Sequence, residues 1–141
     1  PVGLGARDTL RLEMGYHLYG NDMDETRNPI QAGLGWVVPK TKTDYIGADA
    51  IAKIREEGVS EKLVHLLLDK GIPRAGYPVL FEGRQVGVIA SGSHSPSLKQ
   101  GIAIAYLPAE LAKPGIKVQI QVRKNEFDAE VVKAPFYKAQ P

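Results

Sequence analysis

Residues Ile116–Val122 read IKVQIQV and carry the clearest structural signal in the chain. Apolar and polar residues alternate here without a break, so one face of an extended segment is apolar and the other is polar. The run Phe127–Lys133 follows across Lys124–Glu126 and is expected to pair with it as a hairpin. This end of the chain is therefore predicted to form antiparallel β-structure with one solvated face.

Further strands are predicted upstream of this hairpin. Two apolar runs, Lys62–Leu68 (KLVHLLL) and Gly101–Leu107 (GIAIAYL), indicate buried strands. Between them, Tyr77–Glu82 and Gln85–Ser91 flank Gly83-Arg84 and are expected to form a second hairpin. About six short strands, with turn residues every ~8–12 positions, favour a small antiparallel barrel or sandwich.

The first 58 residues have a different pattern. Ala6–Met14 is predicted as a helix whose apolar face carries Leu10, and Asp49–Glu57 as a second helix without chemical signature. Short strands are expected at Tyr16–Tyr19 and Ile30–Val38, on either side of a turn-rich loop. The acidic residues of this loop do not follow a calcium-binding pattern, because the central Gly and the closing Glu are missing. We therefore expect no metal site.

Arg7 and Arg11 lie four residues apart and share a helix face. Like charges at this spacing disfavour an isolated helix, so an anion is expected beside them. It is either a carboxylate of the chain, such as Asp8, Glu13 or Asp24, or the carboxylate or phosphate of a ligand. The spacing alone favours the internal carboxylate.

Trp36 is the only tryptophan, and it follows Gly33 and Gly35 on a predicted strand. Two glycines on one face of a strand indicate close approach by another backbone or by a flat ligand. Trp36 is accordingly interpreted as a core residue by default, with a ring stacked on a planar ligand as the alternative.

Two segments contain a histidine that could belong to a site. His65 lies in an apolar run without a second ligand at metal spacing, which favours a core or half-exposed position. The segment Ser91–Ser97 places His94 among serines, but it lacks the G-x-S-x-G elbow and a third triad member. It is predicted to be a loop tied by its hydroxyl groups, and we expect no catalytic residue in it.

Composition limits the function classes. The chain has 141 residues, enough for one domain with an appended subdomain, and its net charge of +2 does not indicate nucleic acid or a membrane surface. The absence of cysteine excludes thiolate chemistry and suits a cytoplasmic protein. The chain begins with Pro1 and the sequence PVGLG, which is typical of the interior of a longer protein, so we expect a fragment.

Many short motifs occur together in one order along the chain. The N-terminal ones are Gly3–Glu13 (GLGARDTLRLE), Tyr19–Glu25 (YGNDMDE) and Pro29–Trp36 (PIQAGLGW). The later ones are Gly71–Arg74, Gly87, Ser91–Gly92, Ser95–Leu98, Ile102–Tyr106, Lys113–Gly115 and Pro135–Tyr137. Over nearly its whole length the chain resembles the aminomethyltransferase (T-protein) of the glycine cleavage system, in the C-terminal part of that enzyme only.

The resemblance implies an α+β chain that is mainly antiparallel β. Residues 1–58 would be the tail end of the family's folate-binding domain, a helix, loop and strand segment. Residues 59–141 would be the C-terminal β-barrel domain, with a Greek-key-like arrangement. The barrel agrees with the strand pattern described above.

The resemblance also implies an activity. T-proteins take the aminomethyl group carried on the lipoyl arm of the H-protein, pass its one-carbon unit to tetrahydrofolate and release ammonia. The cofactor would be tetrahydrofolate and the partner the lipoylated H-protein, in the cytoplasm. The family's essential Asp, and a Glu that engages folate, belong to an N-terminal portion without equivalent here. The fragment by itself is therefore expected to be inactive.

Four residues are implied as folate contacts. Arg7 matches the arginine of the family's ARD motif, and Tyr16, Trp36 and Tyr137 match aromatic positions. The chemistry fits, because the flat pterin and benzoyl groups of folate suit aromatic walls. The glutamate tail suits a guanidinium fork.

Two alternatives keep the fold and change the function. The domain also occurs in folate-linked demethylating oxidases and in folate-binding repair proteins, although the repair proteins carry a Cys-containing motif that is absent here. The other alternative is a non-catalytic module for folate binding or protein interaction. Folate titration combined with an H-protein-dependent activity assay separates them.

Overall fold

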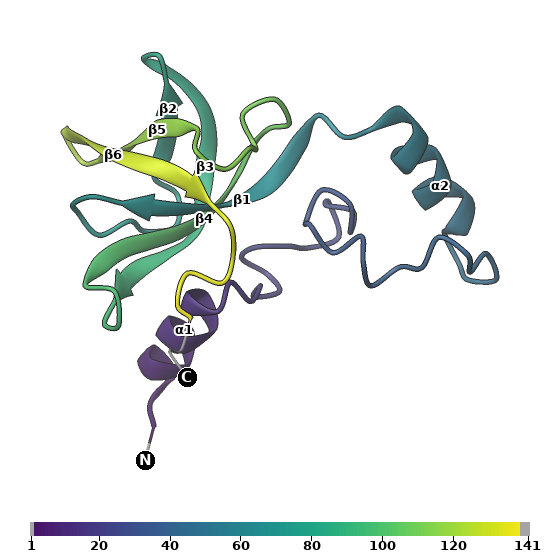
Figure 1. Cartoon of the computed structure of the whole chain (residues 1–141), viewed down its shortest axis with the longest axis horizontal. Coiled ribbons are helices and arrows are strands. Elements are labelled where there is room, and N and C mark those ends of the chain that lie inside the picture. Colours follow the sequence, from purple (N-terminus) through teal and green to yellow (C-terminus); the bar gives the residue numbers. More distant parts are fainter. Residues whose placement is uncertain (1, 139–141) are drawn as a thin grey trace.

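The computed structural model describes residues 2–138. The helices in this part are α1 (Leu4–Glu13) and α2 (Ala48–Glu57). The strands are β1 (Glu61–Leu68), β2 (Pro78–Phe81), β3 (Arg84–Ser95), β4 (Gln100–Pro108), β5 (Lys117–Val122) and β6 (Asn125–Val132) (Figure 1). The strands predicted from alternation and from apolar runs are thus confirmed, and their ends shift by a few residues.

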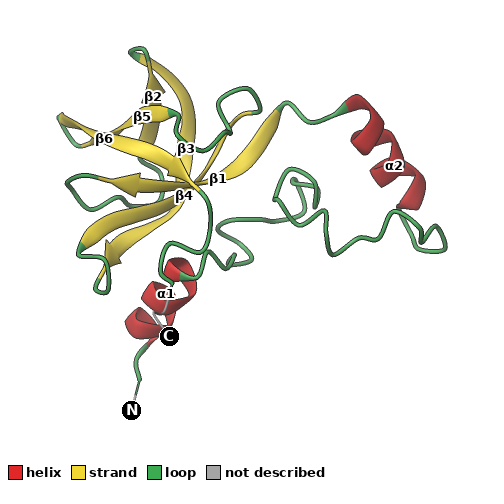
Figure 2. Ribbon diagram, in the orientation of Figure 1, coloured by secondary structure: helices red, strands yellow, loops and turns green. Residues whose placement is uncertain are grey.

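The six strands form a closed barrel in the order β1-β4-β3-β2-β5-β6, and every neighbouring pair is antiparallel (Figure 2). Strands β2, β3 and β4 follow one another along the chain, and β1 lies beside β4, which is a Greek-key arrangement. Pairing of β1 with β6, from His65↔Val132 to Leu68↔Ala129, closes the sheet. The predicted α+β class with a Greek-key-like barrel is confirmed.

The barrel interior follows from the alternation. Val118 and Ile120 of β5 point inward and are buried, together with Val64, Leu66 and Leu68 of β1. Strand β4 differs, because its residues from Gly101 to Leu107 are all buried. The reason is α1, which covers the outer face of β4 and packs Leu12 against Ile102 and Ile104. A strand covered on both faces needs an unbroken apolar run, and GIAIAYL supplies one.

The buried face of α1 is not the predicted one. Leu10 is 59% exposed and Met14 is also exposed, whereas Leu12 and Glu13 are buried. The apolar spacing of the helix therefore describes a face that turns away from the barrel. Gly15 follows the helix with φ +71, a left-handed conformation that favours glycine at a helix end.

Glu13 ties α1 to the barrel through an unusual polar contact. Its buried carboxylate accepts hydrogen bonds from Ser95 Oγ (2.5 Å), Ser97 N (3.1 Å) and Ser97 Oγ (2.9 Å). Burial by itself would raise the pKa of Glu13, but the three hydrogen bonds outweigh it and lower the pKa below its ordinary value of 4.5. The segment Ser91–Ser97 is tied by its hydroxyl groups as predicted. It is not a separate loop, however, because β3 extends through Ser95.

We expect Glu13→Gln to lower the free energy of unfolding by about 1–3 kcal/mol, because the replacement loses charge-assisted hydrogen bonds in a buried site. The folded-state pKa of Glu13 is depressed, so its contribution is fully present above the ordinary pKa of 4.5 and is lost as the pH falls through the folded-state value. Urea unfolding from pH 7 down to pH 3 measures both effects.

The matched control for this experiment is Glu56→Gln, on the exposed side of α2. It should leave the unfolding free energy within about 0.5 kcal/mol of the wild type. The Glu13→Gln protein should lose less stability than the wild type on acidification. If the unfolding free energies of the wild type and of Glu13→Gln fell in parallel with pH, Glu13 would not be the group responsible for the loss of stability in acid.

Two strands predicted in the first 58 residues are absent. Tyr16–Tyr19 forms only an isolated bridge between Tyr19 and Met23. Ile30–Val38 is a series of turns, because the Asn28 side chain accepts hydrogen bonds from the backbone N–H groups of residues 30 and 31. An Asn side chain that accepts hydrogen bonds from nearby backbone N–H groups competes with strand pairing for them. Trp36 consequently lies outside the core and is 81% exposed, so its default interpretation as a core residue is wrong.

Helix α2 was predicted to within one residue, but it has no buried residue. In Figure 1 it lies to one side of the barrel, beyond the connector that follows the turns. The proposed boundary between 1–58 and 59–141 stays a prediction, with the first barrel strand beginning at Glu61. Neither α1 nor α2 has the length and apolar character needed to cross a membrane, and residues 2–138 contain no other helix.

Candidate functional site

An open cleft of about 470 Å³ lies between the end of α1, the turns that follow it and the outside of the barrel. Its lining residues are Met14, Gly15, Tyr16, His17, Met23, Gly33, Leu34, Trp36, His65, Ala134 and Pro135. Most of these are apolar or aromatic, and none is a carboxylate. A concave site of this size with aromatic walls suits a small planar ligand.

The four sequence-predicted site residues do not all meet in this cleft. Tyr16, which is 62% exposed, and Trp36 both line it. Arg7 is exposed on α1 and is not a lining residue. Tyr137 is also outside the lining, and its backbone N–H donates to the carbonyl of Glu13. The structure thus brings the two aromatic residues Tyr16 and Trp36 together at one cleft.

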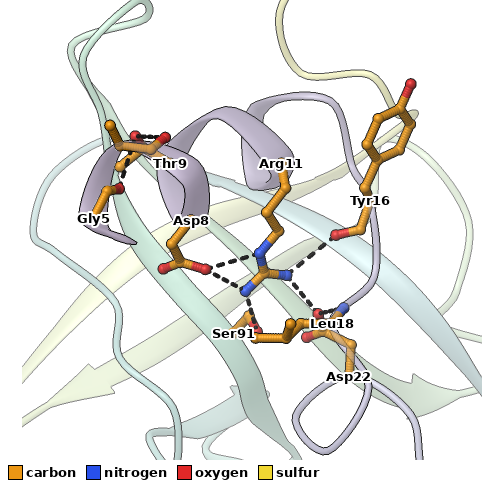
Figure 3. Close-up of polar contacts among 9 residues, drawn as sticks. Gly5, Asp8, Thr9, Arg11, Tyr16, Leu18, Asp22 and Ser91 are labelled. Atoms are coloured by element: carbon orange, nitrogen blue, oxygen red, sulfur yellow. Dashed lines mark hydrogen bonds and ion pairs between the residues drawn. The ribbon is translucent and has the colours of Figure 1, made fainter. Parts of the chain in front are cut away.

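Arg11 organises the polar side of this region (Figure 3). Its guanidinium donates to Asp22 Oδ2 (2.6 Å), Asp8 Oδ1 (2.8 Å), Ser91 Oγ (2.9 Å) and the carbonyl of Tyr16 (3.2 Å). The internal carboxylate favoured by the spacing is therefore present. One of the three residues named for this role, Asp8, is confirmed, and the second carboxylate is Asp22, which the sequence did not indicate.

Asp22 is fully buried and connects the turns to the barrel. Its Oδ2 also accepts from Leu18 N (2.8 Å), and its carbonyl accepts from Tyr106 Oη (2.8 Å). The Arg27 guanidinium lies 4.0 Å from the centre of the Tyr106 ring, in a cation–π contact. Burial raises the pKa of Tyr106 to about 12, so its hydroxyl stays a donor. These contacts fix the segment that follows α1 and with it the wall formed by Tyr16.

Two histidines line the cleft side by side. The rings of His17 and His65 are stacked with centroids 6.4 Å apart, and Phe136 meets His65 edge-on at 5.4 Å. Burial lowers the pKa of both histidines below the ordinary value of 6.5, so both are neutral at pH 7. His65 is half-buried, as expected, but it contributes to the cleft. The described residues contain no group of three or more metal-ligating side chains.

The barrel and the cleft can be compared with known families. The family model for the glycine cleavage T-protein C-terminal barrel domain matches residues 61–138, more than half of the chain. This chain belongs to the glycine cleavage T-protein family. The model for the N-terminal domain of the same family matches residues 1–42, which include α1 and most of the cleft residues. The resemblance drawn from the short motifs is therefore confirmed.

Similar proteins are longer than this T-protein chain. The aminomethyltransferase of Halothermothrix orenii is 53% identical over 137 residues, which are 96% of this chain and 38% of that protein. The aminomethyltransferase of Prochlorococcus marinus is 49% identical over 140 residues, 98% of this chain and 38% of that protein. The chain thus spans about two fifths of the length of these curated relatives.

A solved structure shows the same fold. The crystal structure of the glycine cleavage system aminomethyltransferase T from Bartonella henselae superposes with a TM-score of 0.91 at 35% identity. The match covers 96% of this chain and 39% of that one. Helix α1, the turns and the barrel therefore have the arrangement of a T-protein family member.

Proposed function

We propose that the longer protein to which this segment corresponds is an aminomethyltransferase. It transfers the one-carbon unit of the aminomethyl group on the lipoyl arm of the H-protein to tetrahydrofolate, and it releases ammonia. The observation that carries the proposal is the 53% identity over nearly the whole segment to a protein named aminomethyltransferase. The H-protein partner and the cytoplasmic location are part of the proposal.

The cleft supports the choice of tetrahydrofolate. Its aromatic walls, Tyr16 and Trp36, are exposed and free to stack on a flat ring system. The two histidines line the cleft in their neutral form, so they add no charge beside a flat ring system. The residues present therefore fit the pterin and benzoyl part of folate. When bound, folate supplies the nitrogen atoms that accept the one-carbon unit.

Arg7 suits the anionic end of the same ligand. Within residues 2–138 its guanidinium makes no ion pair, whereas Arg11 binds both nearby carboxylates. An unpaired guanidinium can form charge-assisted, two-pronged hydrogen bonds with a carboxylate. Arg7 lies seven residues before Met14 of the cleft, about 10 Å along a helix. We therefore assign it to the glutamate tail of folate.

The role of this segment is to bind and orient folate. No carboxylate lines the cleft, so we assign no proton transfer to residues 2–138. The catalytic Asp of the family would come from the portion outside this segment. Residues 1–141 alone are accordingly expected to have no aminomethyltransferase activity.

The test compares residues 1–141 with a chain of the relatives' full length that includes this segment. Both are given aminomethyl-lipoyl H-protein and tetrahydrofolate, and methylenetetrahydrofolate and ammonia are measured. We expect products only from the longer chain. Folate binding without products would favour the non-catalytic module. Oxidation of an N-methylated amine would favour a demethylating oxidase.

A further inference from the structure

Trp36 has little packing to hold it in place. Its side chain is 81% exposed, and it lies in turns rather than in a strand. In the next residue, Val37 N donates a backbone hydrogen bond to Leu34 O at 2.9 Å. Nevertheless Trp36 lines the cleft and must keep a fixed orientation to stack on a ligand. A further contact is therefore needed to fix the turn that carries Trp36.

Arg55 of α2 binds this turn on both sides of Trp36. Its Nη2 donates to the carbonyl of Gly35 at 2.9 Å and to the carbonyl of Val38 at 2.5 Å. Hydrogen bonds from a charged donor are stronger than those between neutral groups. One guanidinium thus joins the residue before Trp36 to the second residue after it.

The position of α2 explains why the two hydrogen bonds of Arg55 matter. The helix has no buried residue and no extensive contact with α1 or with any strand among the described residues. It lies against the connector, where a space of about 70 Å³ is enclosed by residues from Pro39 to Arg55. In Figure 1, α2 and this connector stand apart from the barrel. Within residues 2–138, Arg55 is therefore the polar link from α2 to the turn of Trp36.

We propose that Arg55 is a positioning residue and that α2 is a brace for the Trp36 wall of the cleft. Arg55 does not touch the ligand; it holds the backbone of residues 35–38 so that the indole faces the cleft. Its effect on folate rests on the proposed function. Its effect on Trp36 does not, because it is a property of the free protein.

The expected rise in the dissociation constant follows from the fraction of molecules in which residues 35–38 present the indole of Trp36 to the cleft. Without Arg55, residues 35–38 should sample several conformations, and only some of them present the indole to the cleft. If the competent fraction falls to about one tenth, the apparent dissociation constant rises about tenfold. Steps that do not involve Trp36 should be unchanged.

The test uses Arg55→Met, which removes the donors but keeps the apolar stem and the helix propensity. The matched control is Lys53→Met, two residues earlier on the same helix, where the lysine is exposed and forms an ion pair with Glu57 at 3.7 Å. Trp36 is the sole tryptophan of the 141-residue chain, so its fluorescence reports on this turn alone. We expect a larger fast component in the anisotropy decay for Arg55→Met and no change for Lys53→Met.

Tetrahydrofolate binding is then measured in a chain of the relatives' full length. Arg55→Met should raise the dissociation constant about tenfold, whereas Lys53→Met should not. An unchanged anisotropy decay in Arg55→Met, or an equal change in both variants, would overturn the proposal. If Arg55→Met made Trp36 mobile but the wild type did not bind folate, the role of α2 as a brace would be confirmed and the proposed function would be wrong. If Trp36 became mobile and folate affinity were unchanged, the positioning role would be refuted.

Discussion

Replacing Arg11 by alanine is expected to lower the free energy of unfolding by about 3–5 kcal/mol, because it leaves the buried carboxylate of Asp22 without its partner. The side chain of Arg11 is 14% exposed and that of Asp22 is 0% exposed. The change also removes the donor to Ser91 on β3, which joins α1 to the barrel. Urea unfolding at pH 7 measures the loss.

The chain offers a matched control one helical turn away. Arg7→Ala makes the same change at an exposed position, and it should alter the unfolding free energy by less than about 0.5 kcal/mol. A double variant, Arg11→Met with Asp22→Asn, should recover part of the loss, since it removes the buried charge together with its partner. Equal losses from Arg7→Ala and Arg11→Ala would show that the buried pair contributes nothing.

The second large effect is expected on ligand affinity. In a chain of the relatives' full length, Arg7→Ala should weaken tetrahydrofolate binding about 10- to 100-fold. This range corresponds to the roughly 1.5–3 kcal/mol of a hydrogen bond to a charged group. Arg7→Lys should recover only part of it, because an ammonium cannot reproduce a two-pronged contact with a carboxylate. Isothermal titration with tetrahydrofolate gives the dissociation constants.

Measuring affinity and stability on the same variants distinguishes the roles of Arg7 and Arg11. Arg7→Ala should change affinity and leave stability alone, and Arg11→Ala should do mostly the reverse. Tetrahydrofolate that lacks the glutamate tail should bind wild type and Arg7→Ala equally well. Unchanged affinity for intact tetrahydrofolate in Arg7→Ala would remove Arg7 from the proposed site.

The barrel strands were predictable because their pattern is local. Strict alternation in β5 and the apolar runs of β1 and β4 reflect burial that each strand carries in its own sequence. The extent of β3 was not predictable in this way. Ser91 and Ser95 are polar and yet buried, and their partners Arg11 and Glu13 lie 80 and 82 residues away.

The region after α1 was predicted less well, for a similar reason. The apolar run from Ile30 to Val38 has strand composition, but the side chain of Asn28 directs its first residues into turns. Tyr16 entered the candidate site through the family resemblance, whereas Trp36 was also indicated by the two glycines that precede it. Met14 and Met23 carry no signal of their own, because a cleft formed by a helix end, turns and a barrel wall appears only after folding.

The contacts of residues 2–38 with the barrel have a consequence for the integrity of the protein. Arg11 and Glu13 bind β3, Asp22 binds Tyr106, and Gln31 accepts a hydrogen bond from Leu63 N at 2.8 Å. The connector from residue 39 to residue 44, by contrast, is exposed throughout. Cleavage of the backbone there would leave two polypeptides that stay associated through these noncovalent contacts. The connector is thus the natural place to divide this protein into two complementing halves.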